Sequence, residues 1–338
     1  IQVVGKDNRS ASFKSLLLRA GAYNQTDSII SVIALLLVVE ATRLVSGVVL
    51  VSVSGVFLLY AFFGNLVPGF FTHAGYSLKR ICTYAWISTE SILGIPMMVS
   101  STFIFLFLLF ATYLKMTGIG DWLTDLALAV AGHQTGGPAK AAIVASATQG
   151  TISGSSVANT VGTGSVTIPL MKSIGYRSEF AGAVEAAAST GGQLMPPVMG
   201  AAAFIMTEFT ELPYKTIALA ACIPAILYFT GIFIMVHLEA KKNGLTGIPK
   251  ERLPKASKLL KEKWFLALPI VIIVYLLVEG YTPMRAALGG IASSVIIGFI
   301  NAFVDKDQTF GLKEVILGLE EGARSALPVV MACASAGI

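Results

Sequence analysis

Two clusters of small polar residues interrupt an apolar stretch of the sequence, and both contain groups that bind ions. The clusters occupy residues 151–159 and 189–197. A helix that stops inside a membrane leaves up to about four unpaired backbone groups on each side of the break. Freed carbonyls, hydroxyls and amide oxygens suit a hard cation such as Na+, while the N-terminal end of a following helix favours an anion. The candidate residues are Ser153, Gly154, Ser155, Ser156 and Asn159 in the first cluster, and Ser189, Thr190, Gly191 and Gly192 in the second.

The second cluster predicts a discontinuous helix. It contains a Gly-Gly pair at 191–192 and a Pro-Pro pair at 196–197 between apolar segments. Proline removes a backbone donor and restricts the preceding residue, so a continuous helix is hard to build there. Both breaks are expected near the middle of the membrane, where they could face each other and form one site.

Close packing is the competing interpretation of the same residues. Small residues dominate the interfaces between membrane helices, and Gly150 and Gly154 have the spacing of such an interface. Packing explains the many alanines, but it explains neither the clustered serines and Asn159 nor the Gly-Gly and Pro-Pro pairs. Both interpretations remain open from the sequence.

Glu185 lies in the middle of the apolar segment FAGAVEAAAS. Ionisable residues inside membranes are candidates for function, here as a cation ligand, a proton carrier or a partner of a base such as Lys140. A structural role, in which Glu185 is hydrogen-bonded and holds the two broken segments together, is equally compatible with the sequence.

Enzymatic chemistry has little support. The histidines His73, His133 and His237 lie at predicted membrane edges, away from the serine cluster. No G-x-S-x-G or H-E-x-x-H motif occurs, and the G-x-x-x-x-G-K-[ST] phosphate loop is absent from the sequence. Any transport would therefore depend on an ion gradient, and we do not expect an enzyme.

The composition indicates a helical membrane protein with several spans. The 338 residues are 55% hydrophobic and 13% charged, with a mean hydropathy of +0.76, against about 25% charged residues in soluble domains. The apolar runs approach the length of a spanning helix rather than the short alternation of a barrel strand. We predict an all-α polytopic membrane protein in a lipid bilayer, and no nucleic-acid partner despite a net charge of +5.

The distribution of basic residues predicts the topology. They concentrate in residues 238–263, hereafter the basic link, which the positive-inside rule places in the cytoplasm. Counting spans back from it also places Lys172 and Arg177 on the cytoplasmic side. Residues 136–172 must then begin and end on the same side, so we predict a helical hairpin that enters the membrane, turns and returns.

At these residues the sequence resembles a known family. The segments GTISGSSVANTVGTGSVTIPLMKSIGY and AGAVEAAASTGGQLMPPVMGAAAFIM resemble the large membrane subunit of tripartite ATP-independent periplasmic (TRAP) transporters, most closely the fused permeases of the TAXI branch. The resemblance implies a secondary transporter of the bacterial or archaeal cytoplasmic (inner) membrane. It implies sodium-coupled import of organic acids such as dicarboxylates, delivered by an extracytoplasmic solute-binding protein. It further implies an elevator mechanism and an inverted repeat.

The resemblance also assigns residues. It places Ser153, Gly154, Ser155 and Asn159 at a hairpin tip near sodium and substrate, with residues 189–192 as the facing unwound segment. The cation ligands expected on this basis are Ser153, Gly154, Ser155, Asn159, Ser189, Thr190 and Gly192, and the substrate contacts are Ser155, Ser156, Asn159, Thr190 and Gly191. Other readings stay open: an anion carrier coupled to protons or sodium without a binding protein, or a membrane assembly component that transports nothing.

The predicted organisation follows the same resemblance. A charged stretch at 311–326 before Leu327-Pro328 parallels residues 75–93 before Ile95-Pro96, which suggests a second repeat that has only begun where the chain stops. Half of the binding site would then lie beyond the chain. The predicted segments are 1–64, the tail of a small-subunit portion; 65–95, an interfacial connector; 96–237, the first transport repeat, with a hairpin at 136–172 and a broken helix at 178–206; 238–263, the basic link; 264–305, scaffold helices; and 306–338, the start of the second repeat.

Overall fold

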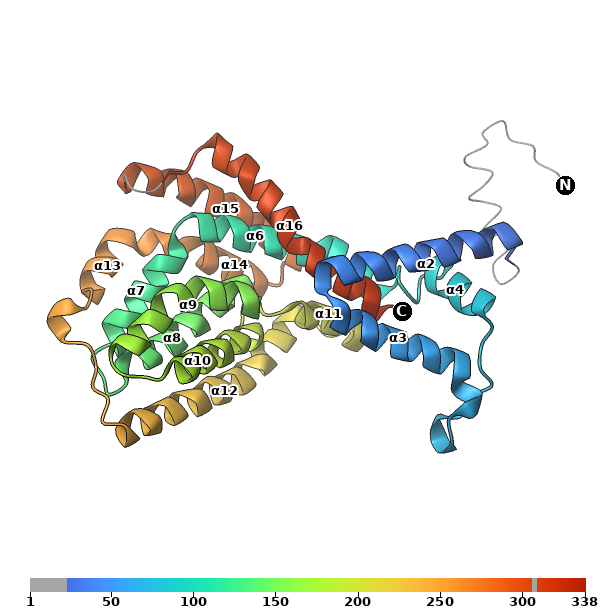
Figure 1. Ribbon diagram of the computed structural model, residues 1–338. Coiled ribbons are helices and arrows are strands. Elements are labelled where there is room, and N and C mark those ends of the chain that lie inside the picture. The colour runs from blue at the N-terminus through green and yellow to red at the C-terminus, as the bar shows by residue number, and fades with distance from the viewer. Residues whose placement is uncertain (1–22, 306–308) are drawn as a thin grey trace. The chain divides into compact units, whose positions relative to one another are not determined.

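A computed structural model describes residues 23–305 and 309–338, and helices are its only regular structure over these residues (Figure 1). This confirms the all-α class. The chain divides into two compact units, one from the described part of Ile1–Ser100 with Leu327–Ile338, the other Ser101–Ala326. The predictions for residues 1–64 and 306–338 fall partly outside the described residues.

The smaller unit is built around α2 (Gln25–Ser46) and α3 (Val48–Phe63). The two helices meet at Gly47, whose φ of 86° lies in the left-handed region that favours glycine. Two short 3-10 turns, η1 (Gly64–Leu66) and η2 (Gly69–Phe71), lead to α4 (Leu78–Ile87) and α5 (Ile95–Val99).

The end of α16 (Leu312–Ala336) completes the core of this unit. The hydroxyls of Ser54 and Ser335 lie 2.6 Å apart and are buried. The buried apolar residues of this core are Leu35, Cys82, Ala85, Ile92 and Ala334.

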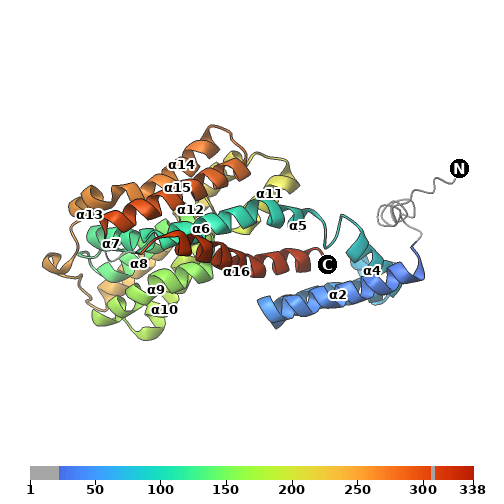
Figure 2. The same cartoon turned by 90° about the horizontal axis from the view of Figure 1, so that it is seen from above.

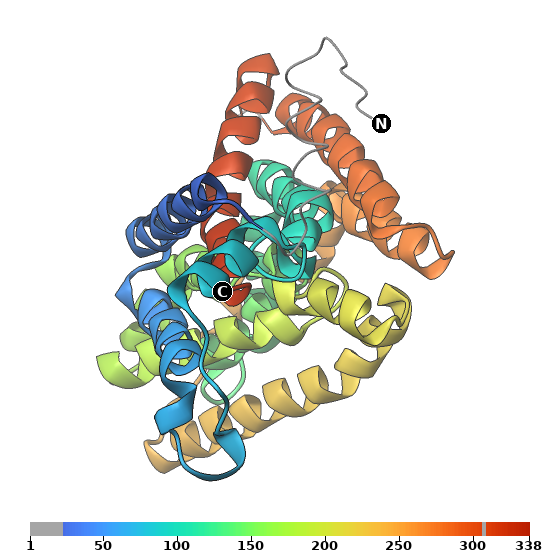
Figure 3. The same cartoon turned by 90° about the vertical axis from the view of Figure 1, so that its right-hand side faces the viewer.

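The larger unit holds both predicted breaks. It comprises α6 (Phe105–Met116), α7 (Ile119–Ala131), α8 (Gly137–Ser153), α9 (Ser156–Ser173), α10 (Ser178–Gly191), α11 (Ala201–Thr210), α12 (Tyr214–Lys242), α13 (Ala256–Lys263), α14 (Leu268–Val278), α15 (Pro283–Val304) and the first part of α16. Helices α8, α9 and α10 pack against one another, with α12 and α15 on different sides of this group (Figures 1 and 3). Figure 2 shows α14 and α15 side by side.

Five of the described helical segments are long and apolar enough to cross a membrane, namely Gln25–Ser46, Val48–Leu66, Ile95–Met116, Tyr214–Lys242 and Pro283–Val304. Each has at least 19 residues, or about 28 Å at 1.5 Å per residue, close to the hydrocarbon thickness of a bilayer. The arms α8 and α9 are not among them. The prediction of a polytopic membrane protein is therefore confirmed.

The basic link begins as helix and then crosses the base of the hairpin. Helix α12 continues to Lys242, so the predicted link boundary at 238 lies inside a helix. Beyond α12, the Ile248 amide donates to the Gly132 carbonyl at 2.9 Å. Leu253 packs against a buried cluster that includes Leu128 and Ala131. These contacts fix the middle of the link against the turn that joins α7 to α8.

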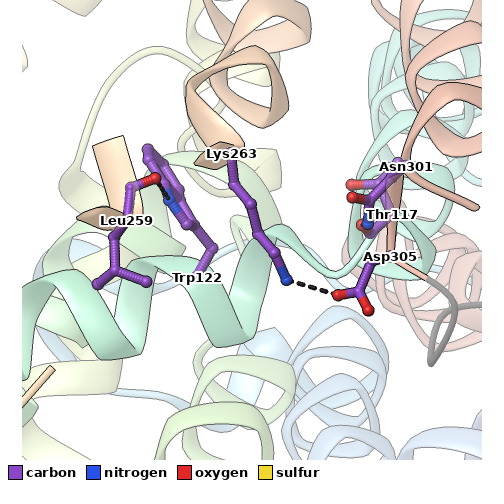
Figure 4. Close-up of polar contacts among 6 residues, drawn as sticks. All are labelled: Thr117, Trp122, Leu259, Lys263, Asn301 and Asp305. Atoms are coloured by element: carbon purple, nitrogen blue, oxygen red, sulfur yellow. Dashed lines mark hydrogen bonds and ion pairs between the residues drawn. The ribbon is translucent and has the colours of Figure 1, made fainter. Parts of the chain in front are cut away.

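The end of the basic link is held on two sides by polar contacts (Figure 4). The Trp122 indole of α7 donates to the Leu259 carbonyl of α13 at 3.1 Å. Lys263 at the end of α13 forms an ion pair of 2.6 Å with Asp305, just beyond α15. Helix α13 is thereby tied to both α7 and α15.

Helix α16 differs locally from the segment that it was predicted to mirror. It runs through Pro328 without interruption. In the earlier segment α4 ends at Ile87, and a new helix begins only at Ile95, with Pro96 in its first turn. The inverted repeat stays a prediction.

Candidate functional site

The first break is a tight turn of two residues between α8 and α9. Gly154 has φ of 55°, and Ser155 is extended and caps α9, its hydroxyl accepting from the Ala158 amide at 3.4 Å. A Cβ on Gly154 would lie 2.0 Å from the Met199 carbonyl oxygen. Only glycine fits this conformation and this approach.

The first break contains fewer non-helical residues than the polar cluster at 151–159 predicted. Ser153 lies in the last turn of α8, and Ser156 and Asn159 lie in the first turns of α9. Helix formation is cooperative, so each arm continues to the one position where left-handed backbone is required. Both arms therefore extend into the polar cluster at 151–159. Two helices joined by a turn agree with the predicted hairpin, while its entry into the membrane stays a prediction.

The second break separates α10 from α11. A 3-10 turn, η4 (Gly192–Leu194), is followed by irregular chain through Pro196-Pro197 to Gly200. Ser189, Thr190 and Gly191 are the last residues of α10, so the expectation that they are unwound was wrong. The reason is that the prolines lie further along and do not disturb the helix before Gly192. The helix is discontinuous, as predicted.

The two breaks meet backbone to backbone. A Cβ on Gly150 would lie 2.3 Å from the Cα of Gly192. The Val198 amide of the second break donates to the Thr151 carbonyl of the first at 3.3 Å. Close packing of small residues, the competing interpretation, therefore operates here and brings the polar residues together.

Asn159 lies at this meeting point with an unused acceptor. Its side chain is 1% exposed, and its Nδ2 donates to the Ser146 carbonyl at 2.8 Å. Its Oδ1 is buried and has no partner among the described residues. A Cβ on Gly192 would lie 2.9 Å from this amide group. A buried acceptor without a partner costs about 1 to 3 kcal/mol, so a group that supplies positive charge would be stabilised here.

The hydroxyl and amide oxygens near Asn159 are neutral, but the Glu185 carboxylate is close by, because the Thr163 hydroxyl lies within hydrogen-bonding distance of both the Asn159 carbonyl and Glu185. Ser153 and Ser155 are half-buried hydroxyls, and Gln193 reaches Ser156 at 3.5 Å. Among the residues that the structure describes, no cluster of three His, Cys, Asp or Glu side chains could hold a metal. The donor set resembles one for an alkali cation more than one for a transition metal.

Three predicted site residues point elsewhere. Thr190 is exposed and bonds back to the Ala186 carbonyl at 2.8 Å. Gly191 is buried against α12, where a Cβ would lie 2.5 Å from the Tyr228 ring. The Ser189 hydroxyl is directed to Glu185. The side chains of Thr190 and Ser189 therefore do not face the hairpin tip, and Gly191 is a packing residue.

Glu185 is fully buried and surrounded by hydroxyls from three helices. Its Oε1 accepts hydrogen bonds from Ser146 at 3.0 Å and from Ser189 at 3.1 Å. Thr163 also donates to Oε1, and Thr167 donates to Oε2 at 2.5 Å. The carboxylate thus joins α8, α9 and α10, and this contact supports the structural role that the sequence left open.

Lys140 is not the partner of Glu185. Its ammonium group donates to Gln134 at 3.2 Å and lies 5.0 Å from the centre of the Phe233 ring. The sequence did not identify the hydroxyl partners of Glu185. Thr163 and Thr167 are four residues apart and so share a helix face. This spacing is the feature of the sequence that could have identified them as partners of one buried group.

Comparison with known proteins identifies the family. Residues 33–338 match the family described as "Tripartite ATP-independent periplasmic transporter, DctM component". This match begins inside the segment predicted as a small-subunit tail, whose assignment stays a prediction. The family is one of transporter membrane components and not of enzymes.

Individual relatives, which are 28 to 30% identical to this chain, agree with the family match. The sialic acid TRAP transporter large permease protein SiaM of Vibrio cholerae is 28% identical over 195 residues, 57% of this chain and 45% of the relative. The C4-dicarboxylate TRAP transporter large permease protein DctM of Pseudomonas aeruginosa is 29% identical over 205 residues, 60% of this chain and 46% of the relative. The sialic acid TRAP transporter permease protein SiaT of Haemophilus influenzae is 30% identical over 193 residues, 57% of this chain and 30% of the relative.

The chain thus spans about half or less of the length of these relatives. Its family match nevertheless extends over most of its own residues, including both helix breaks. On this evidence the chain belongs to the DctM component family of tripartite ATP-independent periplasmic transporters.

Proposed function

We propose that this chain contributes to a site at which a sodium-coupled importer binds an organic carboxylate. The relatives named above are described as sialic acid or C4-dicarboxylate transporters, and both substrates are organic acids. We further propose the TAXI branch, on the motif resemblance. The importer would receive its substrate from an extracytoplasmic solute-binding protein.

The unpaired Oδ1 of Asn159 is the main support for the cation half of this proposal. It lies buried where the hairpin tip meets the second break. A sodium ion would satisfy this oxygen together with backbone carbonyls at the end of α8 and in the turn that follows, from Ser153 and Gly154. The carbonyl end of α10, at Ser189, Thr190 and Gly192, has the partial negative charge that also favours a cation.

The carboxylate of the substrate would bind at the N-terminal end of a helix, which carries partial positive charge. The first turn of α9 begins at Ser156, directly after the half-buried Ser155 hydroxyl. Amide N–H groups in a first helical turn lack intrahelical partners and favour a carboxylate.

The contact of Glu185 with α8, α9 and α10 supports an elevator-like movement. Because one buried carboxylate joins the two hairpin arms to α10, these helices would move as one body. Na+ and substrate held between them would move with it.

Uptake into liposomes tests the proposal. The full-length protein is reconstituted, and uptake of labelled sialic acid and C4-dicarboxylates is measured with and without a sodium gradient and the cognate binding protein. We expect uptake only when both are present. Uptake that ignores sodium and the binding protein would contradict the proposal, and absence of uptake with every anion would favour a non-transporting component.

Asn159→Ala tests the cation half. Asn301 provides a matched control, because it too is buried, bonds a carbonyl through Nδ2 and has an unpaired Oδ1, but contacts Thr117 away from the breaks. Asn159→Ala should raise the sodium concentration for half-maximal uptake about tenfold, equivalent to about 1.4 kcal/mol of lost binding, whereas Asn301→Ala should not. Equal sodium activation in both variants would remove Asn159 from the site.

Proton coupling is a second candidate, favoured by the buried carboxyl of Glu185. Uptake driven by a proton gradient without sodium, and lost in Glu185→Gln, would establish it. Sodium-driven uptake that survives Glu185→Gln would assign the residue to structure alone.

A further inference from the structure

We propose that α13 and the residues before it form a binding site for anionic phospholipid headgroups. Lys255, Lys258 and Lys261 recur every three residues and are exposed. At about 100° per residue they share one sector of roughly 120° of the helix surface. Arg252, one turn before the helix, is also exposed.

The positive charge of this face is only weakly offset. Glu262 lies 3.9 Å from Lys258, but both side chains are more than half exposed, so water screens the pair. A fourth lysine of this segment, Lys263, is not counted, because it forms the ion pair with Asp305. Three lysines on one face therefore remain available to a partner.

Apolar side chains beside the lysines indicate a lipid surface as that partner. Leu260 is 48% exposed and Trp264 is 57% exposed. Trp264 begins the apolar run that leads into α14. Indole rings and snorkelling lysines occur together where the headgroups meet the hydrocarbon. The exposed leucine and tryptophan, next to the apolar run into α14, favour a lipid surface over a nucleic acid or an acidic soluble protein.

The site is formed before any lipid arrives. The bond from Trp122 to the Leu259 carbonyl and the ion pair of Lys263 hold α13 against α7 and α15 (Figure 4). A disordered basic tail must become ordered when it binds, whereas this segment is already folded, so binding avoids that cost. The fixed spacing of the lysines favours several headgroups bound at once.

Fluorescence quenching by brominated lipids tests the proposal on the full-length protein. The protein is reconstituted in phosphatidylcholine vesicles that contain a fixed mole fraction of brominated phosphatidylglycerol or of brominated phosphatidylcholine. The difference between wild type and Trp264→Phe isolates the signal of Trp264. We expect brominated phosphatidylglycerol to quench that signal about threefold more, because each lysine near the bilayer attracts anionic lipid.

Three comparisons make the test decisive. The preference should disappear in about 1 M salt, which screens charges beyond a few ångströms, and in the triple variant Lys255→Gln, Lys258→Gln, Lys261→Gln. It should persist in the control Lys172→Gln, Arg177→Gln, which removes exposed basic residues elsewhere. Equal quenching by the two lipids in wild type would overturn the proposal, even if the triple variant fails to fold. The readout needs no transport, so it stands apart from the proposed function.

Discussion

At the scale of single residues, Glu185 is a buried polar group that contacts three helices of the larger unit. Its fully buried carboxyl receives hydroxyl bonds from α8, α9 and α10. A buried acceptor is tolerated when it is satisfied and is costly when it is not. Replacing Glu185 removes the acceptor that the three helices share. Thr163 and Thr167 can still donate to carbonyls of α9, at Asn159 and Thr163, so the main loss is the contact that joins α9 to α8 and α10.

Glu185→Leu should therefore lower the unfolding free energy by about 2 to 5 kcal/mol, seen as an apparent melting temperature about 5 to 15 °C lower in detergent. Glu185→Gln keeps one oxygen acceptor and should lose clearly less. Glu179, on the same helix, has a side chain that is 77% exposed, and Glu179→Gln serves as the control with almost no expected shift. Equal melting temperatures for all three variants would argue against a structural contact.

The sequence identified Glu185 and Asn159 as important but not their orientation. Gly191 and Gly192 are adjacent, yet one faces α12 and the other the hairpin. Neighbouring residues on a helix point about 100° apart. Composition reveals which residues are unusual in a membrane, whereas the rotation of each helix about its axis is set by packing partners far along the chain.

At the scale of elements, the contact of α8 with the second break depends on the absence of side chains. Gly150→Ala would place a methyl group 2.3 Å from the Cα of Gly192, which is backbone and has little freedom to move away. We expect a loss of about 1 to 3 kcal/mol, measured as a lower melting temperature, together with weaker sodium activation.

Gly182→Ala is the matched control for that variant. Gly182 lies within α10, and a Cβ there would meet nothing within 4 Å. Alanine should stabilise the helix by up to about 1 kcal/mol because it restricts the unfolded chain. If Gly150→Ala were as stable as Gly182→Ala, the backbone contact would not exist in the membrane.

The sequence predicted the hairpin and the discontinuous helix, but it placed the helix ends at the two breaks several residues from where the structure has them. Polar composition marks a break, yet the helices continue through Ser153 and Thr190, until left-handed backbone is needed at Gly154 or the chain approaches Pro196-Pro197. Serine and threonine are tolerated in helices, so they are weaker boundary signals than glycine and proline.

At the scale of the whole molecule, the chain is a multi-pass protein of the cytoplasmic membrane. Helix α12 has 29 residues, about 43 Å at 1.5 Å per residue, enough to cross the bilayer with its ends in water. Its two ends are Tyr214 and Lys242. The loop before it and the basic link after it must therefore face opposite sides.

Cysteine labelling of intact cells tests this topology. In a background without native cysteines, Glu211→Cys should react with a membrane-impermeant maleimide from outside, and Lys250→Cys only after the membrane is opened. Lys172→Cys should behave like Lys250→Cys, because the predicted hairpin returns to its side of entry. Outside labelling at 172 would exclude the hairpin, and labelling of 211 and 250 from one side would exclude α12 as a span.

The contact between Ile248 and Gly132 also fixes an order of events during synthesis. More than 100 residues separate its two partners, so the turn between α7 and α8 leaves the ribosome long before the chain that closes it. Until α12 has been threaded through the bilayer, the base of the hairpin lacks the segment that pairs with it. Closure of the hairpin base is therefore a late step, which waits for a later span rather than for the hairpin's own sequence.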